Sequence, residues 1–178
     1  MQANRGLDQK ELRLFSQALE VAEDRVSDHF RLSSGFWRQH PFEVRTLADL
    51  SPAEVSSEAL AQVLRLRQPQ DERRMRARDF FRICFQDHNF LQLIQREEAW
   101  QRFAPLLTYV LVHELVHVVR FYKFMQLFDA DAKQRAREEA RVHEISADIL
   151  RRVRLPSLDW VLDCYQKHTA ALGAEIHC

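Results

Sequence analysis

Two histidines and a glutamate in the middle of the chain have the spacing of a metal site. His113, Glu114 and His117 form the pattern His-Glu-x-x-His. On a helix, residues four apart lie one turn apart on the same face, so both imidazoles can reach one metal ion. Glu114 lies one step around the helix, within reach of a water bound to that ion. Because zinc lowers the pKa of such a water to about 7, the carboxylate can accept its proton.

The residues around this motif are apolar. From Val110 to Val119, every position outside the motif is valine or leucine. Unpaired polar groups in such surroundings are costly, and a metal would satisfy them. The pattern therefore favours one zinc ion per chain, with Glu114 as general base. The alternative is a core helix whose two histidines bind carbonyl or carboxylate groups elsewhere.

A catalytic zinc site normally has a third protein ligand besides a water. Downstream of the motif, Glu144 and Asp148 are also four residues apart. Together with His-Glu-x-x-His, this pair resembles the gluzincins, the zinc peptidases that include thermolysin, over about residues 110–150. The resemblance implies that Glu144 is the third ligand and that Asp148 orients one of the motif histidines. It also implies a peptide or protein substrate.

His143 is a rival third ligand. It lies about 100° around the helix from Glu144, so the two side chains do not easily share one metal. The nearby Asp148 favours Glu144. The metzincin pattern does not fit, because it requires a glycine and a third histidine soon after the motif. Here His117 is followed by Val-Val-Arg-Phe-Tyr-Lys-Phe.

Peptide hydrolysis would also use a second electrophile, which holds the negative charge that develops on the attacked carbonyl oxygen. Tyr165 and His168, near the end of the chain, are candidates for this role, and so is Tyr122. Their spacing does not choose among them.

Two other functions stay open. Glu114-x-x-His117 also matches half of a di-iron carboxylate site in a helical bundle, which would make the protein an oxidoreductase. Such a site requires a second Glu-x-x-His, whereas Glu139 and His143 are four residues apart rather than three. The other alternative is a metal-binding interaction protein without catalytic activity.

The composition predicts a soluble globular protein. The chain has 178 residues, of which 46% are hydrophobic and 29% charged, and its formal net charge is zero. This length suits a single domain over residues 1–178, and neutrality favours neither a nucleic-acid nor a membrane partner. The three cysteines form no disulfide framework, and the first residues lack the apolar core of a signal peptide. We therefore expect a cytoplasmic protein, whose longest apolar run, residues 106–119, is too short to span a bilayer.

Helical signals dominate the elements that must position the motif. A capping pair, Asp8 and Glu11, precedes an apolar stripe at helical spacing. Ser51, Pro52 and Glu54 predict a second helix to about residue 67. Another helix is expected to begin at Asp71 or Glu72 and to continue to about residue 85. Between these helices, Phe42 to Leu47 alternates like a strand, so we expect at most a short β hairpin near residues 30–47.

The metal helix is expected within residues 100–128. Asp129 or Asp131 caps the helix that carries Glu144, and Pro156 precedes the last helix. The predicted fold class is mainly α, a single zincin-like domain of six or seven helices. Gluzincins have a sheet before the metal helix whose edge strand aligns the substrate. Little in this sequence upstream of the motif predicts such a sheet.

Overall fold

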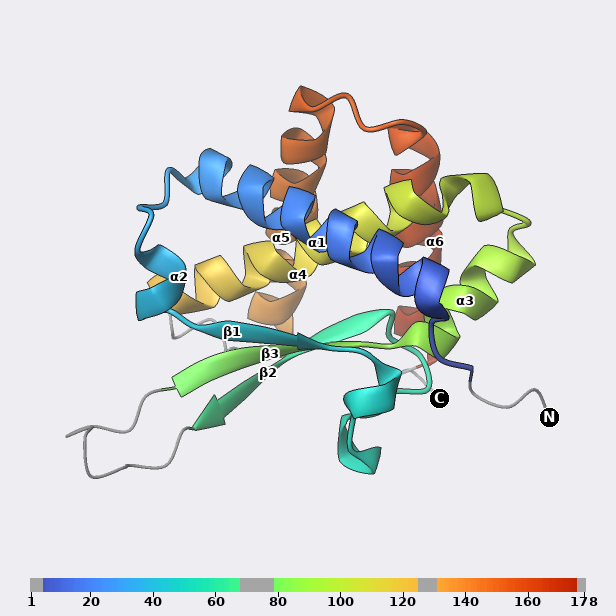
Figure 1. The fold of residues 1–178 in the computed structure, drawn as a ribbon, viewed down its shortest axis with the longest axis horizontal. Coiled ribbons are helices and arrows are strands. Elements are labelled where there is room, and N and C mark those ends of the chain that lie inside the picture. The colour runs from blue at the N-terminus through green and yellow to red at the C-terminus, as the bar shows by residue number, and fades with distance from the viewer. Residues whose placement is uncertain (1–4, 68–78, 125–130, 176–178) are drawn as a thin grey trace.

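The structure is a computed structural model, and it describes residues 5–67, 79–124 and 131–175. Its helices are α1 (Gln9–Phe30), α2 (Phe36–Gln39), α3 (Asp87–Arg96), α4 (Phe103–Lys123), α5 (Ala132–Arg152) and α6 (Leu158–Glu175). Its strands are β1 (Phe42–Arg45), β2 (Ala61–Arg67) and β3 (Asp79–Phe85). The mainly α class is therefore confirmed, with a small sheet that the sequence analysis did not predict (Figure 1).

Helix α4 is the centre of the fold. It contacts α1, the edge strand β2, α5 and α6 (Figure 1). From Leu106 to Val119, every residue except His117 is buried. The segment Trp100–Lys123 is long and apolar enough to cross a membrane by length and composition, and 78% of its most apolar window is buried inside the structure. A helix that is apolar all round needs such cover on every side.

Helix α1 begins as predicted. The Asp8 carboxylate accepts a hydrogen bond from the Glu11 backbone N–H at 2.8 Å, and the Glu11 carboxylate accepts one from the Asp8 N–H at 2.8 Å. Of the predicted apolar stripe, Phe15, Ala22 and Val26 are buried, and the helix packs along α4. This packing covers one side of α4.

Strand β3 is the middle strand of the sheet. It pairs in parallel with β1 and antiparallel with β2, which gives the order β1-β3-β2. Phe81, Ile83 and Phe85 alternate along β3 and are fully buried. Phe81 packs edge-on against Tyr122 of α4, with ring centroids 4.8 Å apart. The sheet thus closes another side of α4, with β2 as the edge strand that contacts it.

The helix predicted over residues 51–67 is wrong, and so is the separate helix predicted to reach about residue 85, because residues 61–67 and 79–85 form strands. Ser51 and Glu54 do form a capping box, but it closes only the 3-10 turn Pro52–Glu54. In β3 the buried residues Phe81, Ile83 and Phe85 recur with a period of two, and the pairing of this strand with β2 overrides the local helix signal. The predicted helix start at Asp71 or Glu72 lies outside the described residues.

The predicted hairpin near residues 30–47 is also only partly right. Phe42–Arg45 is a strand, but its partner is the distant strand β3 rather than a neighbouring segment. Residues 30–37 contain the end of α1 and the start of α2. The pairing depends on a long-range contact, which a local pattern does not contain.

A partly buried ion-pair network holds the 3-10 turn to the sheet. Arg82 of β3 bonds to the carboxylates of both Glu54 and Glu43. The backbone N–H of Ser51, the Arg82 guanidinium and the Ser51 hydroxyl lower the pKa of Glu54 to about 2. A carboxyl whose pKa is lower in the folded state stabilises the fold above its ordinary pKa and loses this contribution as the pH falls toward its folded pKa.

We therefore expect Glu54→Gln to lower the free energy of unfolding by about 1–3 kcal/mol at pH 7, because a hydrogen-bonded charge pair is lost. The difference from the wild type should shrink as the pH falls from about 4.5 to about 2. Urea unfolding at several pH values measures both effects. The exposed Glu58→Gln is the control and should change stability by less than about 0.5 kcal/mol. A pH-independent difference between Glu54→Gln and the wild type would contradict the role of the charge.

Candidate metal site

The three motif residues all come from the buried middle of α4. His113 is 1% exposed and Glu114 is 6% exposed, while His117 is partly buried. The imidazole rings of His113 and His117 lie side by side, with centroids 4.9 Å apart. The helix therefore places both rings together, as their spacing predicts.

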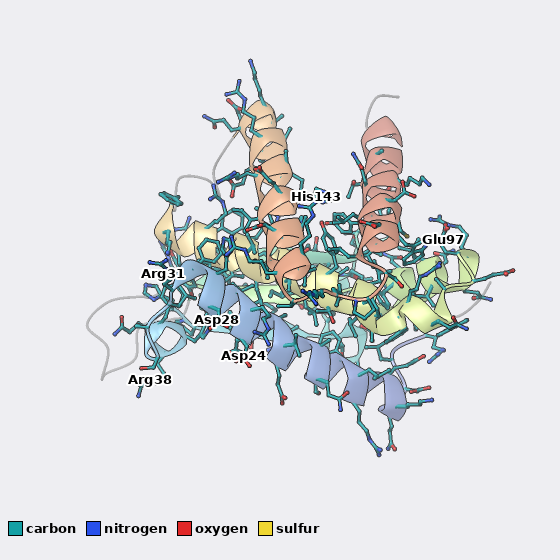
Figure 2. All side chains as sticks on the ribbon, turned by 90° about the horizontal axis from the view of Figure 1, so that it is seen from above. Asp24, Asp28, Arg31, Arg38, Glu97 and His143 are labelled. Atoms are coloured by element: carbon teal, nitrogen blue, oxygen red, sulfur yellow. The ribbon has the colours of Figure 1, made fainter. Side chains whose placement is uncertain are left out.

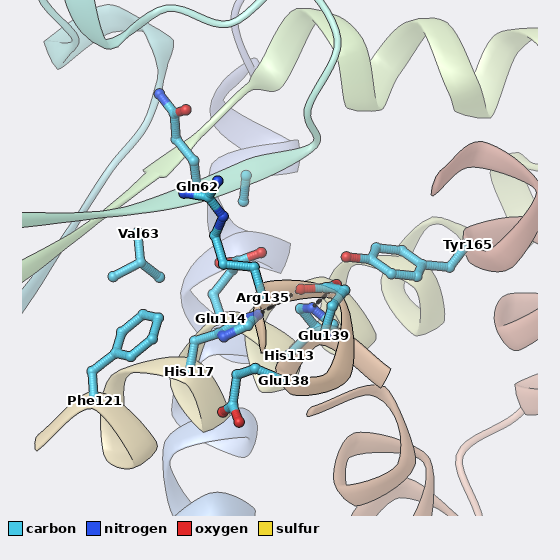
Figure 3. A pocket seen from close by; sticks show the side chains of 11 residues that line it. Gln62, Val63, His113, Glu114, His117, Phe121, Arg135, Glu138, Glu139 and Tyr165 are labelled. Atoms are coloured by element: carbon cyan, nitrogen blue, oxygen red, sulfur yellow. Dashed lines mark hydrogen bonds and ion pairs between the residues drawn. The ribbon is translucent and has the colours of Figure 1, made fainter. Parts of the chain in front are cut away.

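The third member of the group is Glu139 of α5. Its Oε1 lies 2.8 Å from His113 Nε2, and its Oε2 lies 3.0 Å from His117 Nε2. Figure 3 shows this carboxylate beside both histidines. Two imidazole nitrogens and a carboxylate oxygen, all within 4.8 Å of one another, form a possible metal-binding group. This donor set is one of those that zinc takes in catalytic sites, so the residues fit the ion.

Local contacts fix how α5 lies against α4. The side chain of Asp131 accepts a hydrogen bond from the Gln134 N–H at 2.8 Å, so Asp131 caps α5, while the other predicted cap, Asp129, lies outside the described part of the chain. Seven residues into α5, the buried Glu138 forms a two-pronged ion pair with Arg120 of α4. This pair turns the adjacent Glu139 toward the motif histidines.

The structure does not bring the predicted ligand Glu144 to the histidines. Glu144 is 68% exposed and pairs with Arg141 at 2.6 Å on the outer face of α5. Asp148 is 44% exposed and pairs with Arg152 at 2.9 Å. It also lies 4.0 Å from His29 of α1 rather than beside a motif histidine. Because each helical residue adds about 100°, Glu139 and Glu144 point in different directions from the same helix.

His143, the rival ligand, also stays outside the group. Its Nδ1 lies 2.5 Å from the hydroxyl of Tyr109, which is buried in α4. The same hydroxyl lies 3.5 Å from Nδ1 of His113. Tyr109 therefore lies between the predicted rival ligand and the first motif histidine.

Burial and mutual contacts shift the pKa values of these groups. Burial raises the pKa of Glu114 to about 7, although the nearby His117 acts in the opposite direction. Burial lowers the pKa of His113. The pKa of Glu139 is lowered, since its hydrogen bonds to His113 and His117 outweigh the effect of burial. A carboxyl that titrates near neutral pH can both accept and return a proton under ordinary conditions.

A pocket of about 450 Å³ opens onto these residues. One wall is strand β2, which contributes Gln62 and Val63 (Figure 3). The opposite wall carries the motif histidines and Glu114 from α4, with Glu139 from α5. Tyr165 of α6 also lines the pocket and points its hydroxyl toward the group (Figure 3). The sheet whose edge faces the site is therefore present, contrary to what the sequence analysis suggested.

Of the three candidate electrophiles, Tyr165 is the one that reaches the pocket. Its ring centroid lies 5.0 Å from that of His113. His168 instead contacts the carbonyl of Glu58 at 3.1 Å, and the Tyr122 hydroxyl donates to the carbonyl of Pro41. Burial raises the pKa of Tyr165 well above its ordinary value, so its phenol keeps its proton.

Sequence reasoning missed two residues of the site. The sequence pattern placed Glu139 only in a possible di-iron motif and gave no role to Tyr109. The signal for both was the spacing of four, since Tyr109 lies one turn before His113 and Glu139 lies one turn before His143. Spacing alone did not separate Glu139 from the similarly placed Glu144.

Comparison with known proteins does not identify a family. No protein-family model, curated protein or solved structure matches the chain. The chain is therefore characterised by its own geometry, a possible metal site of two histidines and a glutamate on a pair of packed helices.

Proposed function

We propose that the protein is a metal-dependent hydrolase that uses one zinc ion to cleave peptide bonds. One observation carries the proposal: the carboxylate of Glu139 joins both histidines of His-Glu-x-x-His, and the motif glutamate Glu114 lies beside them in an open pocket. Ligand donors and a separate carboxylate base are the components of a metal-assisted hydrolytic site.

His113, His117 and Glu139 would hold the ion. When bound, zinc would supply a Lewis acid and lower the pKa of a coordinated water. Glu114 accepts a proton from the attacking water as the water oxygen bonds to the scissile carbonyl carbon. Glu114 then returns the proton to the amine as the carbon–nitrogen bond breaks. Tyr165 is placed to donate a hydrogen bond to the carbonyl oxygen as that oxygen becomes negative.

The edge of β2 supports a peptide as the substrate. β2 pairs with β3 on one side, and in the described part of the chain it pairs with no strand on the other. Its residues Ala61, Gln62 and Val63 line the pocket that contains Glu114. An extended peptide can add to such an edge through main-chain hydrogen bonds, which would hold the scissile bond across the pocket. The resemblance to gluzincins implies the same arrangement.

The di-iron alternative lacks its second half. A second group of three or more metal-binding side chains is not found among the described residues. Glu138, which could have contributed to one, is paired with Arg120, and His143 contacts Tyr109. The other alternative, a metal-binding protein without catalytic activity, is separated from the hydrolase by experiment.

The test begins with elemental analysis of protein purified without added metal, for which we expect about one zinc per chain. The zinc-loaded protein and the same protein treated with a chelator are then incubated with a peptide library, and the products are identified by mass spectrometry. Products that require zinc, and that return when zinc is restored, would support the hydrolase. One tightly bound zinc without any product would favour a non-catalytic site, and two irons per chain would favour the oxidoreductase.

A further inference from the structure

A buried phenol connects a motif histidine to a histidine of the neighbouring helix. Tyr109 is fully buried in α4, one turn before His113. Its hydroxyl lies 2.5 Å from His143 Nδ1 and 3.5 Å from His113 Nδ1. His143 projects from the side of α5 toward α6, where its ring stacks on that of Tyr165 (Figure 2). The side chains of His143, Tyr109 and His113 thus form one row that ends at the proposed metal site.

The protons of this row can be placed from the contacts. His113 turns Nε2 toward Glu139 at 2.8 Å, so Nε2 is the atom that would bind a metal. A neutral imidazole that binds through Nε2 carries its proton on Nδ1. That proton points to the Tyr109 oxygen, which can accept it because the phenol donates its own proton to His143 Nδ1. In this arrangement His113 donates, Tyr109 accepts one hydrogen bond and donates another, and His143 accepts.

We propose that Tyr109 and His143 are positioning residues of the metal site, which hold His113 in the tautomer and orientation that bind the ion. The proposal rests on the metal site of the proposed function, but not on hydrolysis. A ligand histidine is oriented by the acceptor that its other ring nitrogen finds. Here the acceptor is a phenol, which is in turn held by a second histidine.

The other motif histidine provides a contrast. His117 Nδ1 is buried and has no hydrogen-bond partner among the described residues. The row therefore acts on His113 alone. His143 also lies four residues after Glu139, the spacing that the sequence analysis assigned to Asp148 after Glu144. In the structure, the role expected of Asp148 falls to His143 through Tyr109.

The test measures the affinity for zinc by competition with a fluorescent chelator. Tyr109→Phe removes the relay hydroxyl, and His143→Leu removes the final acceptor. Each is expected to weaken zinc binding by about 10–100-fold, the usual effect of partners that orient a ligand. Tyr109→Phe and His143→Leu interrupt the same row. The double variant should therefore have about the same zinc affinity as the single variant that binds zinc more weakly. His143→Asn, whose amide oxygen can replace Nδ1, should retain most of the affinity.

Tyr122→Phe is the matched control, because its phenol bonds to the carbonyl of Pro41, away from the site. It should leave the zinc affinity unchanged. Unchanged affinity in Tyr109→Phe, or losses that add in the double variant, would overturn the proposal. If Tyr109→Phe does not fold, the comparison of His143→Leu with His143→Asn decides: equal zinc affinity in these two variants would also overturn it.

These outcomes are distinguishable from failure of the proposed function. If the protein binds zinc and shows the coupling between Tyr109 and His143 but cleaves no peptide, the positioning proposal is supported and the proposed hydrolase is contradicted. If the protein cleaves peptides in a zinc-dependent manner but Tyr109→Phe does not change its affinity for zinc, the proposed hydrolase is supported and the positioning proposal is contradicted.

Discussion

Replacing Glu114 with glutamine is expected to lower the rate of zinc-dependent peptide hydrolysis by about 10²–10⁴-fold, because the proton acceptor is lost. The zinc content should not change, since Glu114 is not one of the three residues that surround the proposed ion. The thermal midpoint should stay the same or rise slightly. Glu114 is buried, and removing a charge from a buried position removes a desolvation cost.

The assay compares wild type and Glu114→Gln, both loaded with zinc, on the same peptide library. The exposed Glu144→Gln, which makes the same chemical change away from the pocket, is the control and should retain wild-type activity. Equal cleavage by wild type and Glu114→Gln would reveal a contaminating protease or a mechanism without Glu114. Loss of zinc from Glu114→Gln would indicate that Glu114 is a ligand and would favour the hypothesis of a di-iron carboxylate site.

The second large effect is expected at Glu139. Glu139→Ala removes the only carboxylate of the proposed ligand set, so zinc binding should weaken by more than the 10–100-fold typical of residues outside the ligand set. Glu144→Ala and Asp148→Asn should bind zinc as the wild type does, because both side chains pair with arginines of α5 away from the motif histidines. Affinity is measured by chelator competition and by the rise in thermal midpoint that zinc produces in each variant.

The zinc-induced rise separates metal binding from damage to the fold. A ligand that binds only the folded state stabilises it by about 2.7 kcal/mol at one hundred times its dissociation constant. Glu139→Ala should lose most of this rise, even if its metal-free midpoint also changes. The opposite pattern, in which Glu144→Ala loses the rise and Glu139→Ala keeps it, would establish Glu144 as the third ligand, as the gluzincin resemblance implies.

The sequence alone determined the features that depend on local geometry. His113, Glu114 and His117 lie together on one buried helix because spacing along an α-helix fixes which side chains share a face. The capping box that starts α1 at Asp8 is equally local, and so is the cap of α5, for which the sequence offered Asp129 or Asp131 and the structure shows Asp131. Such features need only a few neighbouring residues.

The sheet was not determined in this way. Ser51 and Glu54 formed the capping box that their sequence predicts, but only a 3-10 turn followed it. The segments beyond it became strands because β3 can pair with both β1 and β2 and bury its alternate residues Phe81, Ile83 and Phe85. Pairing of distant segments outweighs local helix propensity when it buries more apolar surface.

Only the tertiary structure decided which acid of α5 meets the motif. The sequence offers Glu138, Glu139 and Glu144 within two turns, and any of them could have faced the histidines. The choice depends on how α5 is rotated against α4. Burial of its apolar residues Val142, Ile145 and Ile149 fixes that rotation, together with the ion pair between Arg120 and Glu138. Glu139 is thereby placed at the edge of the buried face, against His113 and His117, and Glu144 is turned to solvent, because residues five apart on a helix cannot share one direction.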